Sequence, residues 1–129
     1  MSYGANKYKQ TSITTANRGQ ILIMLYEAAI RNIKKAKLHI EEKNIEGKSK
    51  ALGKVHDIIN ELISSLDFKI GGKIAEDLER LYGFMIEQIM KANMENKTEY
   101  LIPIEKILED LLFAWREAVK EFNLKNPQK

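Results

Sequence analysis

The stretch SSLDFKIGGKIAEDLERLY, residues 64–82, contains the one adjacent pair of glycines in the chain. A glycine-rich turn before a helix can bind a phosphate through backbone amides, and it can also be a plain corner between two helices. A phosphate-binding loop follows a strand and continues into Lys-Ser/Thr. Here an amphipathic segment ends at Leu66, and another follows Gly72 directly. The stretch therefore predicts a corner at which the chain reverses.

The residues of this corner have distinct expected roles. Asp67 is placed to hydrogen-bond the backbone of the turn. Gly72 suits a tight entry into the next helix, because glycine adopts backbone angles that other residues avoid. Phe68 and Ile70 are expected to plug one end of the core.

On both sides of the corner, apolar residues recur at alternating steps of three and four, which is typical of one buried helix face. No comparable stretch alternates with a period of two, so the sequence predicts an all-α chain. The four stripes are Leu22, Tyr26, Ala29, Ile33, Ala36, Ile40; Ile45, Leu52, Val55, Ile59, Leu62, Leu66; Ile74, Leu78, Leu81, Met85, Ile89, Ala92; and Leu101, Ile104, Leu108, Leu111, Trp115, Ala118, Phe122.

Short polar breaks separate the stripes. Because short connections force neighbouring helices to run antiparallel, the sequence predicts an up-down four-helix bundle. Asn17, with Gln20 three residues later, resembles a capping box at the start of the first helix. Pro103 marks either the start of the fourth helix or an irregular first turn. The expected divisions are an N-terminal arm or short extra helix that packs as a cap at 1–16, the bundle at 17–122 and a C-terminal tail at 123–129.

Composition excludes several classes of protein. A chain of 129 residues forms one domain, and without cysteine it has neither disulfides nor a Cys-ligated metal site. The net charge is +3, and the dense basic stretch at 31–37 lies on an amphipathic helix, so it indicates a solvated face and no nucleic-acid partner. No apolar run approaches the roughly 20 residues of a membrane span. With no apolar leader in the first residues, the expected location is the cytoplasm, without membrane insertion.

Patterns of catalytic and metal-binding residues are also missing. Di-iron bundles use Glu-x-x-His pairs, but Ala36 and Gly53 precede the two histidines by three residues. His39 and His56 are therefore expected at the surface or boundary of the fold. Carboxylates at 76–79 and 105–110 are interpreted as solvated faces. We expect no enzyme activity, no catalytic or metal residues and no cofactor.

The informative feature is a surplus of apolar residues at 21–26, where six follow one another and so surround the helix. One face serves the core, and the rest needs another cover. The N-terminal arm could fold back as a lid through Tyr3, Tyr8 and Ile13. The surface could instead bind an amphipathic helix of a partner, and the two readings are compatible if the lid is removable. A weak homodimer through this surface is left open.

Five blocks, in the same order and spacing, resemble the flagellin-specific secretion chaperone family FliS. They cover the chain collinearly from Tyr8 to Phe122. The blocks are YKQTSITTA at 8–16, ILIMLYEAAI at 21–30, SSLDFKIGGKIAEDLERLY at 64–82, KAN at 91–93 and AW at 114–115.

The resemblance implies a cytosolic, non-enzymatic chaperone with an antiparallel helical bundle. Such a protein binds the disordered C-terminal segment of flagellin, prevents premature polymerisation and delivers flagellin to the flagellar type III export gate. It also implies that an N-terminal segment caps a hydrophobic groove, and that the region around Tyr8 contacts the export gate. The expected partner-binding residues are Tyr8, Gln10, Ile21, Leu22, Leu25, Tyr26, Leu66, Leu78, Leu81, Tyr82, Met85 and Trp115.

The alternative is a helical signalling module of a different class. A phosphotransfer-like domain would be phosphorylated on His39 or His56. A self-associating adaptor would form a stable homodimer through residues 21–26 and would not bind flagellin.

Overall fold

The computed structural model describes residues 3–126, and the side chains of residues 18–126 within them. No strand occurs in this range, which confirms the all-α prediction. The elements are α1 (Tyr3–Glu41), α2 (Ile45–Ser64), α3 (Phe68–Gly71), α4 (Lys73–Glu95), the 3-10 helix η1 (Thr98–Tyr100) and α5 (Leu101–Lys125).

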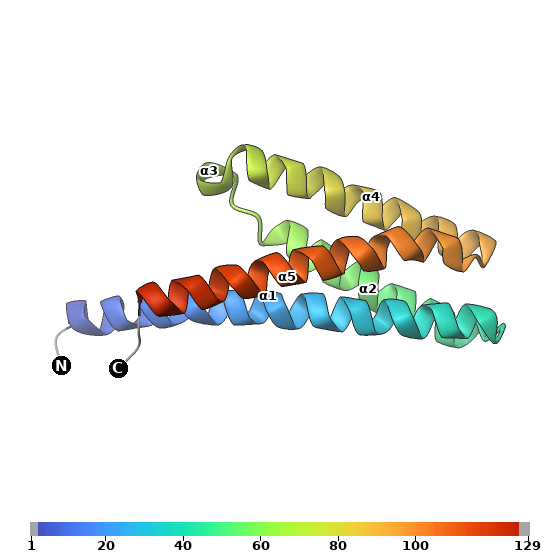
Figure 1. The fold of residues 1–129 in the computed structure, drawn as a ribbon, viewed down its shortest axis with the longest axis horizontal. Coiled ribbons are helices and arrows are strands. Elements are labelled where there is room, and N and C mark those ends of the chain that lie inside the picture. The colour runs from blue at the N-terminus through green and yellow to red at the C-terminus, as the bar shows by residue number, and fades with distance from the viewer. Residues whose placement is uncertain (1–2, 127–129) are drawn as a thin grey trace.

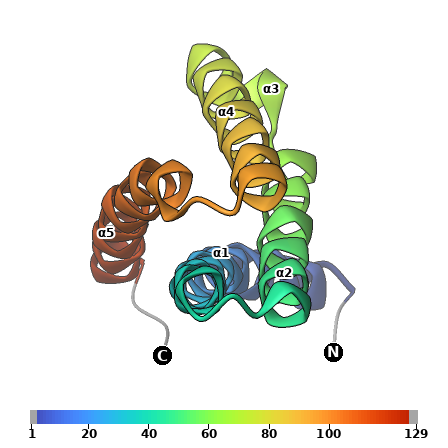
Figure 2. The same cartoon turned by 90° about the vertical axis from the view of Figure 1, so that its right-hand side faces the viewer.

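The long helices alternate in direction along the chain, as Figure 1 shows. In the view along the long axis, α1 lies beside α2 and α5, while α4 stands on α2 (Figure 2). We call the end of the bundle that holds the α1–α2 connection and η1 the closed end, and the end that holds α3 the open end. The start of α4 lies away from α1 and α5 at the open end, and its last turns approach α5 at the closed end (Figure 1).

The first helix is longer than the sequence pattern predicts. It runs without interruption from Tyr3 to Glu41, and residues 5–16 contain no Gly or Pro that would break it. The predicted helix start at Asn17 is therefore wrong, and a capping box has no role there. At the other terminus, α5 continues to Lys125, three residues past Phe122. A capping role for residues 1–16 stays a prediction.

Side-chain caps explain two of the helix starts. Asn44 accepts a hydrogen bond from the backbone N–H of Gly47 at 2.9 Å and so begins α2. Asp67 accepts hydrogen bonds from the backbone N–H groups of Lys69 and Ile70 at 3.0 and 3.1 Å. The predicted role of Asp67 in the corner is confirmed, and its caps make residues 68–71 a single turn of helix.

Backbone conformation sets the other boundaries. Gly72 has φ +51° and ψ −120°, a combination that side chains with a Cβ avoid, and α4 begins directly after it. Asn96 ends α4 in the left-handed conformation. Pro103 lies in the first turn of α5, where its missing N–H would have no helical partner. The fourth long helix therefore starts near Pro103, as one of the two alternatives predicts.

One apolar core joins the four long helices, and its fully buried members lie mostly between the middle of the molecule and the closed end. The buried apolar residues are Ile23, Tyr26, Ala29, Ile30, Ile33 and Ala36 of α1; Ala51, Leu52, Val55, Ile59 and Leu62 of α2; Tyr82, Met85, Ile89 and Ala92 of α4; and Leu101, Ile104, Leu108 and Leu112 of α5.

Polar contacts reinforce the closed end. Lys48 is 4% exposed, and its Nζ donates to the backbone oxygen of Asn93 at 2.9 Å and to Oδ1 of Asn96. This buried ammonium satisfies a backbone carbonyl in the last turn of α4, where positive charge is favourable, and the side-chain amide oxygen of the C-cap residue Asn96. It fastens the C-terminus of α4 to the first turns of α2.

Ion pairs hold α5 on α1 along its length. Lys37 Nζ lies 3.2 Å from Glu105 Oε1, and an Arg116 nitrogen lies 2.9 Å from Glu27 Oε2. Among residues 18–126, no ion pair joins α4 to α1 or to α5. The start of α4 therefore rests on apolar contacts, and α2 and α3 are its neighbours there.

Candidate functional site

A cavity of about 480 Å³ lies at the open end, between α1, α4 and the C-terminal half of α5, with the α2–α3 corner at its edge. Its volume falls in the usual range of ligand pockets, about 300–1,000 Å³. Most of its wall is apolar. The lining residues are Arg18, Gly19, Leu22, Ser65, Leu66, Asp67, Ile70, Gly71, Ile74, Ala75, Leu78, Tyr82, Trp115, Ala118, Val119 and Phe122.

The cavity exists because the apolar stripes of the helices are longer than the core. Toward the open end α5 stays on α1, where Trp115 reaches Tyr26 and Val119 packs at Gly19, but the apolar residues at the start of α4 are only partly covered. Leu78 is half-buried, and Ile74, four residues earlier in the same stripe, is 70% exposed. The α4 stripe continues past its covering partners, so apolar surface remains accessible to another chain.

A small polar cluster lies beside this apolar wall. The Tyr26 and Tyr82 hydroxyls are hydrogen bonded to each other across the interface of α1 and α4. Trp115 of α5 donates its Nε1–H to the Tyr26 hydroxyl oxygen at 3.2 Å. Tyr82 and Trp115 contribute to the cavity wall, although Tyr82 is only 2% exposed, and Tyr26 is fully buried outside it.

Both phenols of this cluster stay protonated. Burial raises the pKa of Tyr26, against the hydrogen bonds from Tyr82 and Trp115, which lower it. Burial raises the pKa of Tyr82 strongly, and the neighbouring Tyr26 adds to the rise. The cluster is therefore a set of neutral hydrogen-bond donors and acceptors at physiological pH.

The α3 corner does not plug the bundle as predicted. Ile70 is 87% exposed and Phe68 is 45% exposed. The single turn that Asp67 caps holds both side chains away from the core, and Ile70 instead contributes to the edge of the cavity. That expectation is wrong because the open end has no facing helix to receive these residues.

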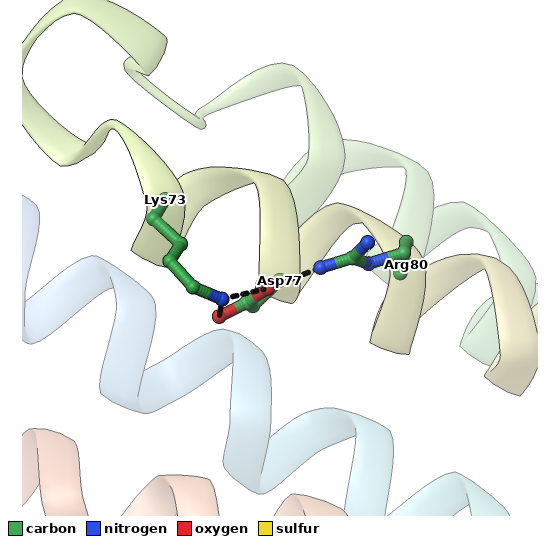
Figure 3. A network of polar contacts seen from close by, with 3 residues as sticks. All are labelled: Lys73, Asp77 and Arg80. Carbon is green, nitrogen blue, oxygen red and sulfur yellow. Dashed lines mark hydrogen bonds and ion pairs between the residues drawn. The ribbon is translucent and has the colours of Figure 1, made fainter.

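The first turns of α4 carry an ion-pair network. Arg80 and Lys73 approach Asp77 from opposite sides along the helix (Figure 3). The hydrogen bond from Arg80, followed by that from Lys73, holds the pKa of the Asp77 carboxyl below its ordinary value. Asp77 is exposed, so these contacts order side chains on the surface and contribute little to stability.

Five of the predicted partner-binding residues meet at the cavity. The other described ones lie elsewhere: Ile21 is exposed on α1 away from the lining, Leu25 and Leu81 are half-buried against the core, and Tyr26 and Met85 are within it. The side chains of Tyr8 and Gln10 lie outside the described residues. Whether any of these residues binds a partner stays a prediction. Those that line the cavity are Leu22, Leu66, Leu78, Tyr82 and Trp115.

Sequence reasoning missed several lining residues from α4 and α5. Ile74, Ala118 and Phe122 are members of the apolar stripes, whose period predicts burial in the core, yet the structure places all three in the cavity wall. Val119 lies off the stripe, and a methyl group of Val119 would lie 2.7 Å from a Cβ added to Gly19. Gly19 therefore lets α5 approach α1 closely beside the cavity, a pairing that spans 100 residues of sequence and leaves no local signal.

The histidines lie away from this cavity and are partly exposed, as predicted. The His39 ring packs against Gly47 at the closed end, and its Nδ1 lies 3.4 Å from Asn44 Nδ2. His56 Nδ1 lies 3.1 Å from Asn60 Nδ2. Within the described residues there is no group of three or more His, Asp or Glu that could hold a metal ion. None of the helices, over the same residues, is both long and apolar enough to cross a bilayer.

Comparison with known proteins agrees with the resemblance. The family model described as Flagellar protein FliS matches residues 1–122. The Flagellar secretion chaperone FliS of Vibrio cholerae is 34% identical over 120 residues, which cover 90% of this chain and 88% of that protein. The proteins of the same name from Salmonella typhimurium and Bacillus subtilis are 32% and 31% identical, each over 88% of this chain and 88% and 84% of their own length. The chain belongs to the FliS family of flagellar secretion chaperones.

Proposed function

We propose that this protein is a cytosolic export chaperone that binds the disordered C-terminal segment of flagellin. It prevents premature polymerisation of flagellin and delivers it to the flagellar type III export gate. The observation that carries the proposal is the open apolar cavity in a member of a family of flagellar secretion chaperones.

The cavity is suited to an amphipathic segment. Apolar positions from α1, α4 and α5 face it, and such a groove accepts the spaced anchors of a helix or a short extended stretch. Each well-buried Leu or Ile anchor contributes about 1.5–3 kcal/mol, whereas ordering a disordered segment costs about 2–5 kcal/mol. A few anchors are therefore enough for stable binding.

The remaining parts of the proposal concern the N-terminal region. In this proposal residues 1–16 cap the groove in the free protein, an arrangement other than the continuous α1 described above, until flagellin displaces them. Tyr8 and Gln10 contact flagellin or the export gate. The protein has no enzymatic activity and needs no cofactor, since its role is to hold an unfolded segment. It neither inserts into membranes nor binds nucleic acid.

The test uses two variants that match in residue type and helix position. Ile74 is the second residue of α4 and lines the cavity, and Ile102 is the second residue of α5 and does not. Both are exposed, at 70% and 56%, so Ile74→Glu and Ile102→Glu should both fold. In calorimetric titration with the C-terminal segment of the same organism's flagellin, Ile74→Glu should bind about tenfold more weakly than the wild type.

The control, Ile102→Glu, should bind as the wild type does. No binding by the wild type at micromolar concentration would overturn the proposal. A stable homodimer that excludes flagellin would favour the self-associating adaptor, and phosphorylation of His39 or His56 by a phosphodonor would favour the phosphotransfer module.

A further inference from the structure

The polar cluster at the cavity has one hydrogen-bond donor more than it can satisfy. The Trp115 Nε1–H and the hydroxyls of Tyr26 and Tyr82 supply three donors. Trp115 donates to the Tyr26 oxygen, and one hydroxyl donates to the other. Among residues 18–126, neither hydroxyl has a further acceptor within hydrogen-bond distance. One O–H group therefore remains without a partner in this part of the protein.

The spare hydrogen belongs to Tyr82. The Tyr26 oxygen already accepts from Trp115, and a hydroxyl that accepts a hydrogen bond becomes a better donor, so the chain Trp115→Tyr26→Tyr82 is favoured. Location gives the same answer. Tyr26 is fully buried and is not among the lining residues, whereas Tyr82, itself only 2% exposed, contributes to the cavity wall. Of the two residues, only Tyr82 forms part of the wall that a segment filling the cavity would contact.

We propose that the Tyr82 hydroxyl donates a hydrogen bond to a backbone carbonyl of the segment that fills the cavity, which rests on the proposed binding of flagellin. The remainder of the wall offers mostly apolar contacts, so this donor sets where the segment sits along the groove.

The donor also selects a conformation of the segment. Inside an α-helix every carbonyl is already paired with an N–H four residues on, and only the last four carbonyls of a helix lack such a partner. The segment that fits is therefore apolar and presents the C-terminal turn of a helix, or a break in one, to Tyr82. An uninterrupted helix would leave the hydroxyl unpaired in an apolar site, which is unfavourable.

The test combines Tyr82→Phe with changes in the ligand. The probes are a synthetic peptide of the C-terminal segment of flagellin and a series in which one backbone amide at a time is replaced by an ester, whose carbonyl is a weaker acceptor. One ester position should weaken binding to the wild-type protein about threefold to tenfold. The same ester should make no difference to Tyr82→Phe, which should bind the unmodified peptide about as weakly as the wild type binds that ester.

Tyr100→Phe is the matched control. Tyr100 donates to Glu95 Oε2 at 2.9 Å near the closed end, so its loss should leave the affinity and the ester pattern unchanged. The double comparison separates a contact with the ligand from a structural role, since a structural loss would weaken all peptides equally. Equal affinity of Tyr82→Phe and the wild type, or no ester position that distinguishes them, would overturn the inference alone. Absence of binding by the wild type would overturn the proposed function and this inference together.

Discussion

The same apolar stripes run through both ends of the bundle, but their residues are buried at the closed end and partly exposed at the open end. At the closed end, α4 and α5 converge through η1, and Leu101, Ile104 and Leu108 are fully buried. At the open end, Ile74 remains 70% exposed although it continues the stripe of α4. At the closed end the apolar residues are buried in the core, and at the open end some of them remain accessible. The proposed chaperone role needs both ends, because an accessible apolar surface has to rest on a rigid frame.

The two ends should differ most in how much the free energy of unfolding falls when a leucine is replaced by alanine. Leu108→Ala at the closed end should lower the free energy of unfolding by about 2–5 kcal/mol, because it leaves a cavity in the packed core. Leu78→Ala at the open end should cost about 1 kcal/mol, because this side chain is already half exposed. Urea unfolding followed by circular dichroism measures both. Equal losses would contradict the division into two ends.

A second difference concerns the ammonium that fastens the closed end. Lys48→Met should lower the free energy of unfolding by about 1–3 kcal/mol, because Asn93 and Asn96 lose the donor that satisfies them. Lys50→Met, on the exposed face of the same helix, is the control and should change it by less than about 0.5 kcal/mol. Hydrogen exchange should become faster at the C-terminus of α4 in Lys48→Met and not at its N-terminus. Equally faster hydrogen exchange along the whole of α4 would argue against a local effect of the Lys48 hydrogen bonds.

At the corner of the open end, replacing glycine by alanine should lower the stability of the protein, whereas the same change inside α2 should raise it. Gly72→Ala should destabilise the protein by about 1–2 kcal/mol, because φ is positive there. Gly53→Ala should stabilise it by about 0.5–1 kcal/mol, since Gly53 lies inside α2 and a Cβ there would contact nothing within 4 Å. Thermal unfolding of the two variants provides the comparison. Higher stability of Gly72→Ala would show that α4 can begin without the positive φ at this corner.

The smallest effect should come from the ion-pair network of α4. Because Arg80 and Lys73 lower the pKa of Asp77 from 3.8, the folded state binds the proton more weakly than the unfolded state. The network therefore stabilises the protein above about pH 4, and the effect is lost as the pH falls through the lowered pKa. Wild type and Asp77→Asn should differ slightly in their urea midpoints at neutral pH and converge in acid. High salt should remove the difference as well, since the pair is exposed. A difference that persisted in acid would mean that charge is not its cause.

Local sequence patterns were sufficient for the elements and for most of the turns. The period of the stripes identified the long helices, and Asp67 and Gly72 identified the corner, because both signals depend on neighbours along the chain. The helix start at Asn17 failed for a related reason. A capping pair indicates a helix start only where the preceding residues cannot continue the helix, and residues 5–16 contain no breaker.

The candidate site could be predicted only in part. The structure places five of the residues that the sequence predicts for partner binding in the cavity wall, namely Leu22, Leu66, Leu78, Tyr82 and Trp115. Tyr26 and Met85 belong to the same stripes and are fully buried, so stripe membership does not separate ligand surface from core. No local pattern predicts that Lys48 is buried, since its hydrogen-bond partners lie 45 and 48 residues away.

The sequence by itself determined that this protein is a set of amphipathic helices joined by tight turns, because periodicity and turn chemistry are local properties. The tertiary structure decided how far along each stripe a facing helix extends. It also brought together Tyr26, Tyr82 and Trp115, which are 56 and 89 residues apart. The burial of each apolar stripe residue depends on how far the start of α4 lies from α1 and α5. That separation arises from packing between segments that are distant in the sequence. The position of the open cavity follows from this packing alone.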